Sequence, residues 1–105
     1  MTKMEELKAR VERVERGVFE HSVCRKALDE LLDMQSEITD IREAFLSHPF
    51  IGTTVEELED LRFRILESEF NVHIFASEAM YQDTEEHMRR LTELYESVSE
   101  GGGNQ

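Results

Sequence analysis

The sequence predicts an all-α fold, an antiparallel helical hairpin or elongated helical bundle that is completed by dimerisation. Apolar residues recur at alternating steps of three and four along much of the chain, which is the spacing of one face of a helix. The only proline, Pro49, lies near the midpoint in a cluster of turn formers at 48–54. Proline lacks the backbone N–H and clashes with the preceding helical turn. We therefore expect the chain to reverse at residues 48–54, between two helical arms.

The first predicted arm covers residues 3–47 and begins at a capping box formed by Thr2 and Glu5. Two seams with heptad spacing follow, the first made of Met4, Leu7, Val11, Val14 and Val18, and the second of Cys24, Ala27, Leu31, Met34, Ile38, Ile41 and Phe45. The step from Val18 to Cys24 is one residue short of a heptad. Either the helix is overwound there or it breaks near Gly17. We expect a continuous helix with at most a mild kink, because no proline accompanies the glycine.

The second predicted arm covers residues 55–99 and begins at a capping box, either Thr54 with Glu57 or Thr53 with Glu56. It carries two apolar stripes, the first made of Val55, Leu58, Leu61, Ile65 and Leu66, and the second of Met80, Thr84, His87, Leu91, Leu94 and Val98. If this arm breaks, it does so near 69–72, where Asn71 tolerates caps and turns. We expect residues 1–100 to form a single helical domain and the glycine-rich residues 101–105 to form a disordered tail.

The chain is strongly acidic, with 24 acidic residues, 12 basic residues and a net charge of −12. Proteins that bind the phosphate backbone of nucleic acids need a basic face, so we expect no direct nucleic-acid binding. No apolar stretch is long enough to span a membrane, and the first residues are charged rather than apolar as in a leader. We therefore expect a cytoplasmic protein without a membrane partner.

The four histidines do not occur in a metal-binding pattern. A di-iron site in a helical bundle uses Glu-x-x-His on two helices. The residue three positions before His21, His48, His73 or His87 is never acidic. We expect no bound metal and no other cofactor.

Cys24 and the arginine pairs have structural interpretations. Cys24 is the only cysteine and belongs to the second seam, so we expect its side chain to be buried and unreactive. A catalytic thiolate would need a base such as His21, and apolar surroundings would raise the thiol pKa. Acidic residues flank the pairs Arg62/Arg64 and Arg89/Arg90, which favours ion pairs within the helix. We identify no catalytic residue and expect a protein that is not an enzyme.

The phenylalanines outnumber what one seam between two arms can bury. Large apolar side chains outside the intramolecular face mark protein interfaces. The predicted interface residues are Phe63, Phe70, Phe75, Phe50 and Ile51. We expect this surface to join copies of the chain in a homodimer or higher oligomer, most simply in a four-helix arrangement.

A pattern of helical segments recurs between about residues 31 and 99, made of Leu32, Asp33, Met34 and Gln35, the corner at 49–54, and the segments 56–61, 71–79 and 91–98. In this pattern the chain resembles the YlbF/YmcA-type small helical regulatory proteins, which include YheA-like members. The amino-terminal helix departs from the family pattern, and the cysteine-bearing tail of some members is absent, so iron–sulfur binding is not carried over. The resemblance implies a helical oligomer that acts as a non-catalytic regulatory or adaptor subunit, in some relatives in RNA processing and development.

Three classes of function follow from these observations. The first is a non-enzymatic regulatory or adaptor protein that acts through protein–protein contacts as a homo-oligomer. The second is an acidic protein, such as a secretion chaperone or a phage-type inhibitor, that occupies a basic surface of its partner. The third is a small enzyme with a site between protomers, which is disfavoured because few polar residues fall on the apolar seams. We expect the first class.

Overall fold

The computed structural model describes residues 2–103, with side chains up to residue 98, and is all-α. Its helices are α1 (Lys3–Val23), α2 (Leu28–Ser47) and α3 (Val55–Gly103). No strand occurs within residues 2–103, and the predicted all-α class is confirmed. None of the helices in this part of the chain has an apolar stretch that could cross a membrane.

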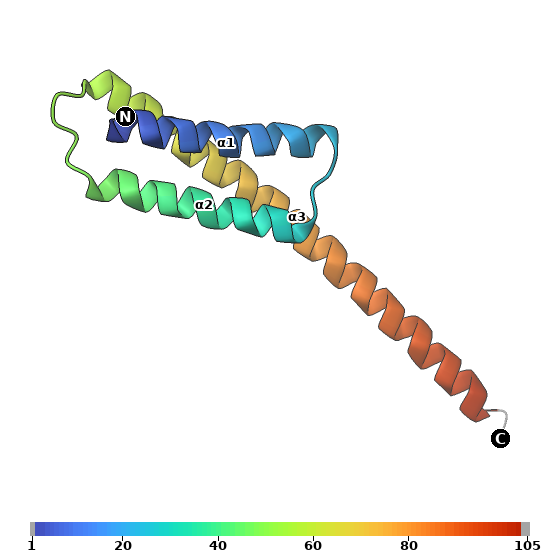
Figure 1. Ribbon diagram of the computed structural model, residues 1–105. Coiled ribbons are helices and arrows are strands. Elements are labelled where there is room, and N and C mark those ends of the chain that lie inside the picture. The colour runs from blue at the N-terminus through green and yellow to red at the C-terminus, as the bar shows by residue number, and fades with distance from the viewer. Residues whose placement is uncertain (1, 104–105) are drawn as a thin grey trace.

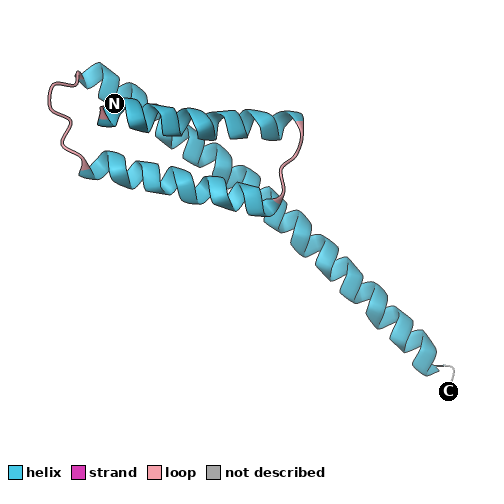
Figure 2. Cartoon of the chain, viewed as in Figure 1, coloured by secondary structure: helices cyan, strands magenta, loops and turns pink. Residues whose placement is uncertain are grey.

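Consecutive helices run in opposite directions, and the third extends far beyond the other two (Figure 1; Figure 2). The molecule is consequently elongated, with extents of 79 × 27 × 20 Å. We call α1, α2 and residues 55–79 of α3 the bundle. We call residues 80–103 of α3 the arm. Every arm side chain up to residue 98 is exposed.

The core of the bundle receives one apolar stripe from each helix. Its buried members are Met4, Leu7, Val11 and Val14 of α1, Ile38 and Ile41 of α2, and Leu61, Ile65 and Val72 of α3. Most of these side chains are fully buried. The helical spacing seen in the sequence therefore selects the buried face of each helix.

The predicted continuous first arm is wrong, because the chain leaves the helix at residues 24–27 and reverses. Cys24 and Ala27 have extended backbones, with φ of −141° and −66° and ψ of 115° and 157°. The two seams were out of register by one residue because they lie on two helices. Gly17 lies inside α1, where a Cβ atom would be 2.8 Å from Cε of Met34. This glycine gives room to a side chain of α2 and does not break the helix.

His21 and Lys26 hold the unpredicted turn between α1 and α2. The backbone N–H of Lys26 donates to Nδ1 of His21 at 2.9 Å. The ammonium group of Lys26 also lies 2.9 Å from a carboxylate oxygen of Glu20. These contacts link the last turn of α1 to the residues before α2, so the turn has local stabilisation without proline or glycine.

The predicted reversal at 48–54 is confirmed, with α2 ending at Ser47 and α3 beginning at Val55. Gly52 has a φ of 80°, which favours glycine over other residues. Of the two capping alternatives, the structure uses Thr54, whose Oγ1 accepts the backbone N–H of Glu57 at 3.2 Å. Thr2 caps α1 as predicted, accepting the backbone N–H of Glu5 at 3.1 Å.

The break considered near 69–72 does not occur, because α3 is continuous through Asn71. Ser68, Val72 and Ala76 are buried on either side of it, so the packed face passes through this segment without a change of period. Asparagine in a helix interior costs well under 1 kcal/mol, which such packing offsets. The helix also includes Gly101–Gly103 of the predicted tail, and residues 104–105 lie outside the described residues.

Arginine–glutamate pairs join every two helices of the bundle. Arg10 of α1 lies 3.0 Å from Glu37 of α2, and Arg42 of α2 lies 2.8 Å from Glu69 of α3. Arg64 of α3 binds both carboxylate oxygens of Glu15 on α1, at 3.1 and 2.6 Å. The hydrogen bond with Glu15 raises the pKa of Arg64 above its ordinary value.

The prediction that all the arginine pairs bind within their own helix is therefore wrong for Arg64. Arg64 pairs with Glu15 because it lies at the edge of the packed face of α3, next to α1. Arg89 and Arg90 do pair within α3, at 3.9 and 2.7 Å from Glu86.

Truncating a core leucine should destabilise the bundle, whereas truncating an exposed one should not. Leu7 is fully buried and Leu46 is 72% exposed. We expect Leu7→Ala to lower the free energy of unfolding by about 2–5 kcal/mol and Leu46→Ala to change it by less than about 0.5 kcal/mol. Urea denaturation followed by circular dichroism measures both. Equal losses in the two variants would contradict this packing.

Candidate protein interaction surface

Helix α3 has two apolar faces, one packed in the bundle and one exposed along the helix. One face, with Leu61, Ile65 and Val72, packs in the core. The other points outward, and we call its residues the outward stripe: Phe63, Leu66, Phe70, His73, Ser77, Met80, Thr84, His87, Leu91, Leu94 and Val98. These positions alternate steps of three and four without interruption, and all of them are exposed. The stripe therefore has the spacing of a coiled-coil seam, and its apolar side chains are exposed within the described part of the chain. At His73 it borders α2, since Nδ1 of His73 lies 3.3 Å from Nε2 of Gln35.

The outward stripe joins two features that the sequence shows separately. Phe63 and Phe70, two of the predicted interface residues, are 65% and 64% exposed on the bundle. Leu94, from the predicted carboxy-terminal stripe, is 62% exposed on the arm. Because α3 does not break near Asn71, these residues follow one continuous stripe of one helix. The stripe winds slowly around the helix axis, since seven residues complete slightly less than two helical turns. Leu66, which was predicted to share the packed stripe of Leu61, belongs to the outward face instead.

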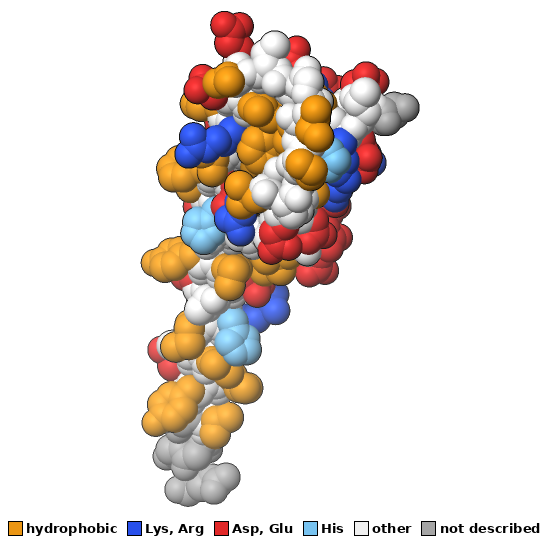
Figure 3. All heavy atoms as spheres, turned by 90° about the vertical axis from the view of Figure 1, so that its left-hand side faces the viewer, with side chains coloured by type: hydrophobic (Ala, Val, Ile, Leu, Met, Phe, Trp, Pro, Cys, Tyr) orange, Lys and Arg blue, Asp and Glu red, His pale blue; other side chains and the backbone are white. Residues whose placement is uncertain are grey.

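Three further exposed side chains widen the stripe on the arm. Tyr81, Met88 and Tyr95 each follow the stripe by one position and recur every seven residues. Leu91, Leu94, Tyr95 and Val98 line a shallow, mainly apolar hollow near the end of the arm. Figure 3 shows hydrophobic side chains gathered along this part of the molecule. The row formed by Tyr81, Met88 and Tyr95 was not predicted, although its seven-residue spacing is visible in the sequence.

The remaining predicted interface residues lie elsewhere. Phe75 is half-buried and its ring lies 4.5 Å from that of His21, centroid to centroid. Phe50 is half-buried against the core, 5.4 Å from the ring of Phe45. Ile51 is 93% exposed in the 48–54 loop. Of the five residues, the structure places only Phe63 and Phe70 together on the outward stripe.

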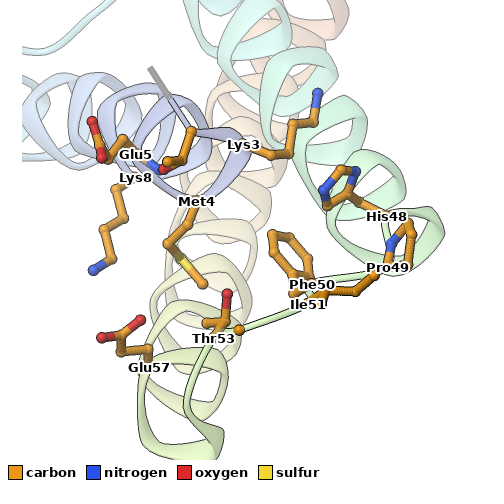
Figure 4. Close-up of a pocket in the computed structure, with 12 residues that line it drawn as sticks. Lys3, Met4, Glu5, Lys8, His48, Pro49, Phe50, Ile51, Thr53 and Glu57 are labelled. Atoms are coloured by element: carbon orange, nitrogen blue, oxygen red, sulfur yellow. The ribbon is translucent and has the colours of Figure 1, made fainter.

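A polar hollow of about 590 Å³ lies where the start of α1 approaches the 48–54 loop. Lys3 and His48 lie on one side of it, and Lys8 and Glu57 lie on the other (Figure 4). These side chains point in different directions rather than toward a common point. Among the described residues, no three His, Cys, Asp or Glu side chains are grouped as metal ligands would be. The hollow therefore does not suggest a reaction or a metal.

The prediction that Cys24 is buried is wrong, because its side chain is exposed. Cys24 ends α1, and its backbone N–H donates to the carbonyl oxygen of Glu20 at 2.8 Å. Its heptad position placed it on a seam only under the assumption that the helix continued through residues 24–27.

Comparison with protein-family models, curated proteins and solved structures finds no match for this chain.

The exposure of Cys24 reverses the expected chemistry of its thiol. We expect a thiol reagent to modify Cys24 in the native protein at a rate close to that of the urea-unfolded protein. Because the side chain fills no core space, Cys24→Ser should change the free energy of unfolding by less than about 0.5 kcal/mol. Absorbance with a chromogenic disulfide reagent measures the rate, and a native thiol that reacts only on unfolding would contradict the exposed position.

Proposed function

We propose that this protein is a non-enzymatic interaction protein of the regulatory or adaptor kind. It acts through protein–protein contacts as a homo-oligomer, and its binding surface is the outward stripe of α3. The observation that carries this proposal is the exposed and largely apolar stripe, which runs from Phe63 on the bundle to Val98 on the arm with uninterrupted three- and four-residue spacing.

The energetics of the arm support a protein partner. Most helical stability in proteins comes from packing of an apolar face, and isolated helices are marginal in water. The arm has no such packing within its own chain, since each of its side chains up to residue 98 is exposed. Covering one large apolar side chain is worth about 1.5–3 kcal/mol. A partner along the stripe would therefore stabilise the arm and bury its leucines together.

The resemblance to YlbF/YmcA-type proteins, which stays a prediction, implies the same adaptor role. The acidic alternative would bind a basic surface mainly through carboxylates, and such binding weakens as salt screens the charges. Binding through the apolar stripe should instead be maintained or strengthened by moderate salt, since each chain carries a net charge of −12.

Photo-crosslinking in the native host tests the proposed function. We expect a photoreactive phenylalanine analogue at Leu94 to form a covalent adduct with a protein, which is either a second copy or another chain. The matched control is Leu46, which is 72% exposed and lies on α2 rather than on α3. Immunoblotting and mass spectrometry measure the adducts at both positions.

A strong adduct at Leu94 with little at Leu46 supports a binding surface on α3. Absence of any protein adduct at Leu94, or equal yields at the two positions, would overturn the proposed function.

A further inference from the structure

We propose that the occupant of the outward stripe is a second copy of this chain, paired antiparallel so that the arm of each copy lies on the bundle of the other. This inference rests on the proposed function and specifies the partner and the geometry. It follows from the continuity, length, side-chain order and charge of α3.

An arm cannot cover the outward face of its own bundle. Both belong to one uninterrupted helix, so they point along the same line and never face each other (Figure 1). The exposed Phe63 and Phe70 and the exposed Leu91 and Leu94 can be joined only between molecules. A second copy supplies both halves of the seam at once, and twofold symmetry then covers both arms.

The two halves of the seam match in length. From Phe63 to Met80 and from Met80 to Val98, α3 advances by roughly 26 Å each, at about 1.5 Å per residue. The arm of one copy therefore spans the outward face of the bundle of the other. Both ends of the outward stripe are apolar, whereas its middle contains His73, Ser77 and Thr84.

One antiparallel register places the apolar residues against each other. In it, Leu94 faces Phe63 of the partner copy, Leu91 faces Leu66 of the partner copy, and His87 faces Phe70 of the partner copy. A histidine ring against a phenylalanine ring already occurs within the chain, between His21 and Phe75. Nearer the middle, His73 faces Thr84 of the partner copy and Ser77 faces Met80 of the partner copy. At the end of the stripe, Val98 lies opposite Glu59 of the partner copy.

Charges beside the seam agree with this register. It brings Arg90 next to Glu69 of the partner copy, since these positions flank the stripe on the same side. Glu69 already accepts a hydrogen bond from Arg42 through Oε1, and its Oε2 is buried, so Arg90 of the partner copy would act on this carboxylate by charge attraction from outside the pair. An antiparallel pair lays residues 80–103, with 6 acidic and 2 basic residues, on the bundle of the other copy, whereas a parallel pair would place two copies of residues 1–79, with 18 acidic and 10 basic residues each, side by side.

Sedimentation equilibrium tests the identity of the partner. We expect the purified wild-type chain to be a dimer at tens of micromolar, and Leu94→Asp to weaken dimerisation at least about 100-fold while circular dichroism remains helical. Leu46→Asp is the matched control and should leave the dimer intact. A wild-type monomer at this concentration, or equal effects of the two variants, would overturn self-pairing.

Cysteine pairs test the orientation, in a Cys24→Ser background that removes the native thiol. The chain with both Leu66→Cys and Leu91→Cys should form an interchain disulfide on mild oxidation, because these positions face each other only in the antiparallel pair. Each single variant should stay uncrosslinked, since its two copies lie far apart. A covalent dimer of either single variant would overturn the antiparallel arrangement in favour of a parallel one.

The outcomes separate this inference from the proposed function. A monomeric purified chain whose Leu94 position still captures a different protein in the host would overturn self-pairing, and with it the homo-oligomeric part of the proposed function, but would leave the interaction with another protein standing. Failure of capture in the host would overturn the function itself.

Discussion

The uninterrupted backbone of α3 is the constraint on which the rest of the molecule depends. Its packed face supplies Leu61, Ile65 and Val72 to the core. Its opposite face carries Phe63 and Phe70 outward. Because a single helix holds both faces and then continues, every apolar side chain of the outward stripe keeps a fixed spacing relative to the bundle. A break near Asn71 would have separated the part of the outward stripe on the bundle from the part on the arm.

The bundle and the arm differ in the contacts that stabilise them and in their exposure to solvent. The bundle has a closed core and arginine–glutamate pairs between every two helices, as between Arg64 and Glu15. The arm has neither, and its ion pairs, such as Arg90 with Glu86, lie within one helix and in solvent. Exposed pairs of this kind contribute little to stability. The bundle is therefore stabilised by contacts within the chain, whereas the arm would be stabilised by packing against another chain.

The proposed binding surface would select partners by shape rather than by charge. A net charge of −12 opposes association at a distance, whereas a regular apolar seam favours a helix of matching spacing at contact. Polar positions such as His73 and Thr84 interrupt the seam near its middle. In coiled coils such positions favour one register over others at some loss of stability.

The sequence by itself determined the all-α class, the reversal at 48–54 and the helix starts at Thr2 and Thr54, because caps, proline and heptad spacing act locally. It also contained the register slip between Val18 and Cys24, but the slip alone did not distinguish an overwound helix from a reversal. Tertiary packing decided that question, since Met34 fills the space beside Gly17 and the two seams face a common third helix. It likewise decided that α3 continues through Asn71, that Arg64 pairs across helices, and that Cys24 is exposed. Each of these depends on which helices lie side by side, and local propensity carries no such information.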